Sequence, residues 1–164
     1  MGINGRGDVI LTDAERSLLE GRAFHAFFET MVPATGSAYF AFTTGDNPVL
    51  SVIQTFTTSS DVIDIEFFEG ADIADGTSVT VFNKDRTSSD NSTILIKNNP
   101  TVNSEGTKID KTKIGSTAIA NTVITSIING YLPWRLKANT SYLVKFTNTG
   151  NSDITVISRI SIFE

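Results

Sequence analysis

The side chains best suited to acid–base chemistry are two carboxylates on a segment with the alternating pattern of a β-strand. Asp64 and Glu66 are two residues apart, so a strand places both on one face, where such a pair could act in glycoside hydrolysis. Ile63, Ile65 and Phe67 alternate with them, which predicts that the opposite face is buried. We therefore expect Asp64 and Glu66 on a solvated outer face, with a hydrolase as an alternative.

His25 is the only histidine of the chain, and it lies within an expected strand among phenylalanines. A Ser–His–Asp catalytic triad requires a histidine beside a nucleophile. His25 is instead expected among phenylalanines, so we expect a structural role for it. The chain has no cysteine, which together with the single histidine argues against a zinc site. Acidic loops around Asp72 and Asp75, or Asp85 and Asp90, could offer oxygen ligands to calcium, but such loops are common without metal. We expect no metal, no cofactor and no enzymatic activity.

An aromatic pair late in the chain is the candidate for sugar binding. Tyr131 and Trp134 could form a platform on which a glycan stacks. Trp134 is also the only tryptophan, and burial between two sheets would explain it equally well. Both interpretations are open from the sequence.

Length and charge limit the classes of partner. The 164 residues fit one domain that can bury a substantial core. A formal net charge of −5 argues against a nucleic-acid partner, because binding to phosphates depends on Lys and Arg. No apolar run approaches the ~20 residues that span a bilayer, and the first residues lack the apolar segment of a signal peptide. We expect no membrane partner and synthesis in a cytoplasm.

Short strands separated by turns account for most of the chain. Alternation predicts strands at 23–32, 37–44, 49–58, 62–69, 77–83, 93–97, 132–137, 141–147 and 154–163. β-Branched residues dominate 107–130, which predicts strand and loop there rather than helix. The predicted fold class is all-β, a jelly-roll-like antiparallel β-sandwich over residues 23–164.

Residues 1–22 differ from the rest and predict an N-terminal arm with a short helix. Thr12 and Glu15 have the spacing of a capping box, in which each side chain satisfies a free backbone N–H. This spacing predicts a helix at 12–20. The helix has few apolar residues besides Leu18 and Leu19, so it must dock on a partner or on its own sandwich to be stable.

Motifs of turns and strand ends recur in a set order over residues 35–164. Glu69-Gly70 follows one strand, Asn83-Lys-Asp-Arg86 ends another, and Leu136-Lys-Ala-Asn139-Thr140-Ser-Tyr142-Leu143 forms a hairpin, with Asn148 downstream and Phe163-Glu164 at the end. In this order the motifs resemble a family of capsid decoration, or cement, proteins of tailed bacteriophages. The arm lies outside the part that carries the resemblance.

The resemblance implies a non-enzymatic protein that binds the outer surface of a phage capsid, with the major capsid protein as partner. Such proteins are often β-sandwiches or jelly rolls assembled as trimers, which implies a homotrimer on the outside of the virion. The acidic net charge suits the exterior of a shell better than its DNA-filled interior. The alternative is a receptor- or glycan-binding module of a phage fibre or tail tip, with Tyr131 and Trp134 as stacking residues.

The arm contains the residues that we expect at the capsid. Arg6, Arg16 and Arg22 could pair with carboxylates of an acidic shell, since a guanidinium binds a carboxylate through two hydrogen bonds. Leu18 and Leu19 lie between these arginines and could add apolar contacts.

Apolar residues on outward-facing strand positions predict a contact between subunits. Phe27, Phe68, Ile157 and Phe163 all fall at such positions. Single exposed apolar side chains are ordinary, but several on sandwich strands indicate an interface.

Overall fold

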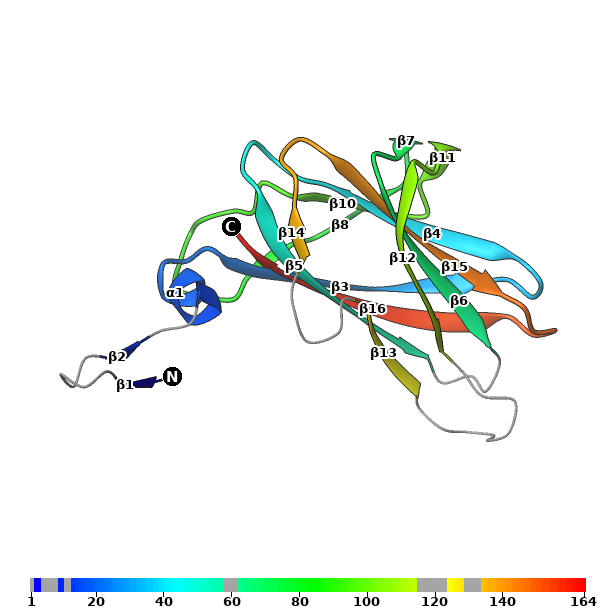
Figure 1. Ribbon diagram of the computed structural model, residues 1–164, viewed down its shortest axis with the longest axis horizontal. Helices are drawn as coiled ribbons and strands as arrows, with labels where there is room; N and C mark the ends of the chain where they lie inside the picture. The colour runs from blue at the N-terminus through cyan, green and yellow to red at the C-terminus, as the bar shows by residue number, and fades with distance from the viewer. Residues whose placement is uncertain (1, 4–8, 11–12, 58–61, 115–123, 129–133) are drawn as a thin grey trace.

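The computed structural model describes residues 2–3, 9–10, 13–57, 62–114, 124–128 and 134–164, whose path is shown in Figure 1. A short helix, α1 (Asp13–Leu19), precedes two six-stranded sheets that pack on each other. Neighbouring strands in both sheets are antiparallel. The predicted all-β antiparallel sandwich is confirmed.

The two sheets are distinguished by their strand order. The first sheet runs β12-β6-β15-β4-β10-β8, and the second runs β13-β5-β16-β3-β9 with β14 also paired to β5. The strands of the first sheet are β4 (Ser37–Thr43), β6 (Ile63–Glu69), β8 (Thr77–Val79), β10 (Leu95–Asn98), β12 (Thr107–Ile114) and β15 (Ser141–Asn148). The strands of the second sheet are β3 (Ala23–Val32), β5 (Val49–Thr57), β9 (Phe82–Asn83), β13 (Ile124–Ile128), β14 (Trp134–Leu136) and β16 (Ile154–Phe163). Two further pairs of short strands form separate two-stranded sheets. They are β1 (Gly2–Ile3) with β2 (Val9–Ile10), and β7 (Asp72–Ala74) with β11 (Thr101–Ser104).

Aromatic rings fill the space between the sheets. Phe40, Phe42, Phe67 and Tyr142 of the first sheet point inward and are at most 1% exposed. The ring centroid of Phe42 lies 5.4 Å from that of Tyr142 and 6.2 Å from that of Phe67. Phe28 of the second sheet meets Phe40 edge-on at 4.9 Å. Burying one such side chain stabilises the fold by roughly 1.5–3 kcal/mol, so this cluster joins the two layers.

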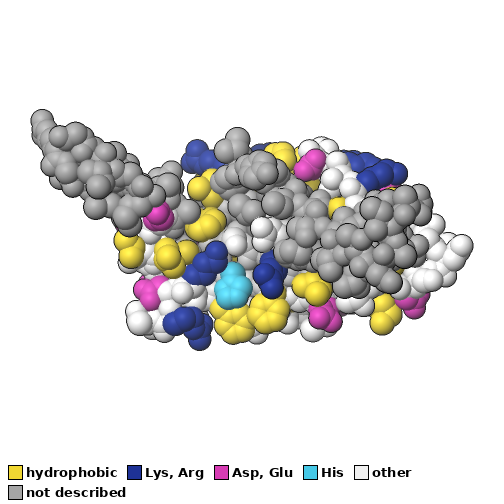
Figure 2. Space-filling model, turned by 90° about the horizontal axis from the view of Figure 1, so that it is seen from below, with side chains coloured by type: hydrophobic (Ala, Val, Ile, Leu, Met, Phe, Trp, Pro, Cys, Tyr) yellow, Lys and Arg dark blue, Asp and Glu magenta, His cyan; other side chains and the backbone are white. Residues whose placement is uncertain are grey.

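The outer faces of the two sheets differ in chemistry. On the second sheet, His25 and Phe27 point outward from β3, and Figure 2 shows the histidine beside hydrophobic side chains with Lys and Arg nearby. On the first sheet, Asp64 and Glu66 of β6 and Lys145 of β15 form ion pairs on the outer face. One face is therefore partly apolar, and the other is covered with charges.

The prediction of one strand at 77–83 is wrong. β8 pairs with β10 in the first sheet, whereas β9 pairs with β3 in the second sheet, so the chain changes sheets near residues 80–81. Val79 and Val81 are both half-buried against the core. Because the chain passes from one sheet to the other at the end of the core, Val79 and Val81 both still face inward. Their alternation with polar residues therefore looks like that of a single strand.

β7 and β11 lie in segments between the strands predicted from the sequence. They pair with each other and form a flap over the first sheet. Ile73 and Val102 of this flap pack on Ala41, Phe68 and Leu143. The expectation that Phe68 is exposed is wrong, because the flap covers it and leaves it 3% exposed. The flap gives this outer face a second, smaller apolar cluster.

A glycine permits the close approach at the base of the flap. Gly106 has a φ of +80°, a region that most side chains avoid. A Cβ at this position would lie 2.4 Å from the carbonyl oxygen of Glu69, so a larger residue would push the flap off the sheet.

The phenol of Tyr142 connects the core to the hairpin before β15. It accepts a hydrogen bond from the backbone N–H of Lys137 at 2.8 Å and donates one to Glu69 at 3.1 Å. Burial raises the pKa of Tyr142 to about 12, so the phenol stays protonated and can donate. The side chain of Lys137 also forms an ion pair with Glu69, which closes this network.

Tyr142→Phe is expected to lower the free energy of unfolding by about 1–2 kcal/mol, because it leaves the N–H of Lys137 without its acceptor. Tyr39→Phe is the matched control, since its hydroxyl lies 3.5 Å from Glu105 and the ring is only half-buried. We expect the control to change stability by less than about 0.5 kcal/mol. Urea unfolding measures both, and equal effects would contradict the role of this network.

Candidate functional site

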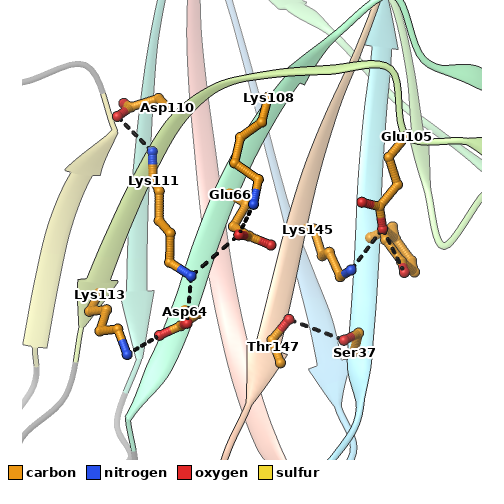
Figure 3. Close-up of polar contacts among 11 residues, drawn as sticks. Ser37, Asp64, Glu66, Glu105, Lys108, Asp110, Lys111, Lys113, Lys145 and Thr147 are labelled. Atoms are coloured by element: carbon orange, nitrogen blue, oxygen red, sulfur yellow. Dashed lines mark hydrogen bonds and ion pairs between the residues drawn. The ribbon is translucent and has the colours of Figure 1, made fainter.

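The two carboxylates that sequence suggested for catalysis lie on the outer face of β6, as expected. The prediction that both are solvated is wrong for Glu66, which is 8% exposed because lysine side chains cover it. Figure 3 shows that lysines of the neighbouring strand β12 point toward them. The ammonium of Lys111 lies 2.9 Å from Asp64 and 3.3 Å from Glu66, and Lys113 lies 3.0 Å from Asp64. Lys108 also pairs with Glu66. We call these five residues the charge ladder.

The charge ladder keeps both carboxylates ionised. Partial burial raises the pKa of Asp64, but hydrogen bonds and charges of Lys111 and Lys113 outweigh it and leave the pKa below its ordinary value. Hydrogen bonding from Lys108 is the largest cause of the lowered pKa of Glu66. A glycoside hydrolase requires one carboxyl with a raised pKa as proton donor. This pair supplies no such donor, so its geometry favours a structural role.

The motif residues that carry the sequence resemblance also have structural roles. The side-chain amide of Asn83 donates to the carbonyl oxygens of Gly21 at 2.7 Å and Asp90 at 3.1 Å. The amide of Asn148 donates to the carbonyl oxygen of Ser152 at 2.7 Å. The side-chain amides of Asn83 and Asn148 therefore fix loops and turns.

Two arginines of the predicted capsid-binding set line one surface pocket. Arg16 from α1 and Arg22 from the segment after it lie around a pocket of about 270 Å³. Arg135 of β14, which sequence did not single out, joins them from the second sheet. The remaining lining residues are Ser17, Pro48, Val49, Leu50, Phe163 and Glu164. We call this site the arginine pocket.

The charges of the arginine pocket are only partly neutralised. Arg22 forms an ion pair with Glu20 and donates to the carbonyl oxygen of Glu164. The carboxylate of Glu164 is used elsewhere, since it accepts hydrogen bonds from Ser92 at 2.6 Å and from the backbone of Thr93 at 3.0 Å. Within the described part of the chain, neither Arg16 nor Arg135 forms an ion pair. The pocket can therefore accept a carboxylate beside its apolar wall.

The helix α1 docks on its own chain. It contacts β3 and β16, and Ser17 is buried against the sandwich. Leu18 and Leu19 are instead 39% and 70% exposed, so they do not cover the end of the sandwich. They remain available to a partner beside the arginine pocket.

The other predicted site residues fall in different places. Trp134 is half-buried and packs edge-on against Phe67, with ring centroids 6.1 Å apart, which gives it a packing role. Arg6 and Tyr131 lie outside the described residues. The stacking pair of the glycan-binding alternative, the contact by Arg6 and the division into arm and sandwich at residue 22 stay predictions.

Of the acidic side chains considered for calcium, Asp85 binds within its own loop. Asp85 accepts hydrogen bonds from the backbone and hydroxyl of Thr87 at 2.9 and 2.7 Å. Among the described residues, no group of three or more His, Cys, Asp or Glu side chains could hold a metal ion. Over the same ranges, no helix has the length and apolar character required to cross a membrane.

Sequence reasoning missed part of the outer surface of the second sheet. Phe27 is 57% exposed as expected, and Ile157 and Phe163 are partly exposed. Phe82, however, also lies beside Phe27, at 6.3 Å between ring centroids. Its place could not be found while 77–83 was taken as one strand, because a single strand keeps Phe82 in the same sheet as Val79.

Comparisons with known proteins find similarity to solved structures at low sequence identity. No family model and no curated protein matches the chain. Among solved structures, a BFDV capsid protein from a 60-mer is 9% identical, with a TM-score of 0.21, over 87% of this chain and 91% of that one. The structures of the Gt and Gx strains of infectious bursal disease virus are 14% and 17% identical, with TM-scores of 0.20 and 0.19. They match 87% and 86% of this chain, which spans 39% of each of theirs.

The first of these structures is of a capsid protein and the other two are of a virus, and all three are less than 25% identical to this chain.

The charge ladder predicts how stability depends on pH. Because the folded-state pKa values of Asp64 and Glu66 are lowered, their ion pairs stabilise the fold fully above the unfolded values of about 4. This stabilisation is lost as the pH falls through the lowered values. The Asp64→Asn, Glu66→Gln variant should therefore lose less unfolding free energy than the parent chain between about pH 7 and pH 3.

Urea unfolding at several pH values tests this expectation. The control is Glu29→Gln, Asp46→Asn, which removes two carboxylates that form no ion pair with another described residue. The control should retain the pH dependence of the parent chain. A ladder variant with the same dependence as the parent would refute the assignment.

Proposed function

We propose that the chain is a non-enzymatic structural protein of a virion, which binds the outer surface of a phage capsid and stabilises it. The sequence resemblance to decoration proteins motivates this proposal. The major capsid protein would be the partner, and the chain would be assembled as a homotrimer. A protein that binds only the assembled shell stabilises that state by mass action.

The observation that carries the proposal is the arginine pocket beside exposed leucines. Arg16, Arg22 and Arg135 lie at one end of the sandwich, and the helix that bears Arg16 also exposes Leu18 and Leu19. Guanidinium groups pair with carboxylates, and exposed leucines gain from burial in an interface. The end of the sandwich thus combines charge and apolar contacts suited to an acidic protein surface.

The net charge supports a partner that is a protein rather than a nucleic acid. A chain of net charge −5 is repelled by phosphates at long range, whereas a local group of arginines can still bind carboxylates. The outer-surface location follows from this argument and from the resemblance, and it is part of the proposal.

Reversing a charge in the arginine pocket is expected to weaken binding to undecorated heads of the parent phage. Arg16→Glu or Arg135→Glu should raise the dissociation constant at least about tenfold, which corresponds to about 1.4 kcal/mol. Lys97→Glu makes the same charge change on β10 of the first sheet and is the control. Co-sedimentation of protein with heads measures all three.

Binding of the two pocket variants at the strength of the control would contradict the proposal. Melting curves of the isolated variants verify that the sandwich is still folded. A variant that fails to melt cooperatively is replaced by Arg16→Gln or Arg135→Gln, for which a weaker effect in the same direction is expected.

Deleting residues 2–21 tests the contribution of the arm as a whole. The helix contacts β3 and β16 through few residues, so the sandwich should remain folded without it. Affinity for undecorated heads should again fall at least about tenfold. Unchanged affinity would show that the arm is not part of the contact, and a truncated chain that cannot fold would place the arm in the core.

A further inference from the structure

Three aromatic rings form a cluster on the outer face of the second sheet. The ring centroids of His25, Phe27 and Phe82 are separated by 5.7 to 6.3 Å, and their planes are inclined by 16° to 33°. Phe27 is 57% exposed, and Met31 further along the same strand is 65% exposed. The second sheet therefore exposes two large apolar side chains, Phe27 and Met31, and no described element packs over them.

Cations surround this cluster. Arg86 lies 5.9 Å from the ring centroid of Phe82, and Lys84 lies 5.1 Å from that of Phe163. Arg159 is opposite Phe27 in the strand register. We call these three cations with His25, Phe27, Met31, Phe82 and Phe163 the aromatic–cationic face, and Figure 2 shows Lys and Arg side chains on both sides of the histidine.

The histidine adds no charge to this face near neutral pH. Burial lowers the pKa of His25, and the charges of Lys84, Arg86 and Arg159 lower it further. The side chain of Glu29 is exposed on the same side of β3, between Phe27 and Met31, and places one carboxylate among the residues of the face. The face therefore combines apolar side chains with three cations and one carboxylate, a net charge of +2.

We propose that the aromatic–cationic face docks on a second copy of this chain, against a different and acidic part of that copy's surface. Because the whole chain carries −5 and the face carries +2 (three cations and Glu29), the rest of the chain carries −7. The net charge outside the face is thus negative and opposite in sign to that of the face. Burial of Phe27 and Met31 supplies apolar contact, and the cations select the acidic surface.

Charge also decides against the pairing of two identical faces. A two-fold interface would bring a face with a net charge of +2 toward the same face of the other copy, and like charges across an interface are unfavourable. A head-to-tail arrangement instead places the face of one copy on the acidic surface of the next. Such an interface forms a ring if the rotation between copies closes.

This inference deepens the proposed homotrimer, because it names the face that joins the copies. Of the residues of this face, only Phe163 also lines the arginine pocket, and the variants tested at each surface are different. The two proposals can therefore fail separately. Arg16→Glu should weaken binding to heads and leave self-association unchanged, whereas a face variant should weaken self-association in the absence of any capsid.

Sedimentation velocity of the purified chain over micromolar concentrations tests the proposal. The parent chain should self-associate, and Phe27→Asp should raise the dissociation constant at least about tenfold, or about 1.4 kcal/mol. Leu95→Asp is the matched control, because Leu95 is 66% exposed on β10 of the first sheet. The control should associate like the parent chain.

A monomeric parent chain, or equal effects of Phe27→Asp and Leu95→Asp, would overturn the assignment. Arg86→Glu is a second face variant that replaces an exposed cation and leaves every strand intact. It should weaken association in the same way if Phe27→Asp proves unstable in melting curves. Association should also weaken as NaCl rises from about 50 to about 500 mM, and unchanged association would remove the role of the cations.

Mixing experiments separate the two arrangements. In a head-to-tail interface, the Phe27→Asp chain keeps its acidic surface, so a labelled variant should still bind to parent chains in an equimolar mixture. In an interface of two identical faces, the variant lacks its only contact surface and would stay monomeric in the mixture. That second outcome would overturn the head-to-tail arrangement.

Discussion

The aromatic cluster between the two sheets is the interaction on which the rest of the structure depends. Phe28 of the second sheet meets Phe40 of the first, and the rings of Phe42, Phe67 and Tyr142 continue the contact through the core. Because successive side chains of a strand point to opposite faces, placing these rings inside also determines which residues face out. The charge ladder and the aromatic–cationic face are both consequences of this alternation.

The fold could be predicted from the sequence where one strand lies in one sheet. The alternation of β3, β6 and β16 leads directly to their bounds and to the outward position of Phe27 and Asp64. It failed at 77–83, because two strands in different sheets follow each other there with no break in the pattern. It also failed at the flap, since Ile73 and Val102 lie in segments rich in turn formers and pack only on distant strands.

The candidate site was predictable only in part, for a related reason. Arg16 and Arg22 are close in sequence, and their chemistry could be recognised together. Arg135 joins them because β14 pairs with β5, a contact that no local pattern reveals. The functional surfaces of this chain thus combine short-range motifs with partners brought in by sheet pairing. Both surfaces lie on the second sheet, and Phe163 at the end of β16 belongs to each of them.

The pairing of β3 with β16 has a consequence for synthesis of the chain. The first long strand, Ala23–Val32, bonds along its length with the last, Ile154–Phe163, so this contact spans almost the whole sequence. Only two residues of β3, Phe24 and His25, pair with the earlier strand β9, so most of the backbone of β3 stays unpaired until β16 has been synthesised. Folds dominated by such distant contacts form slowly and expose unpaired edges meanwhile. The second sheet is thus completed only after β16 has been translated. Before that point, the unpaired edge of β3 is exposed and is a binding site for chaperones.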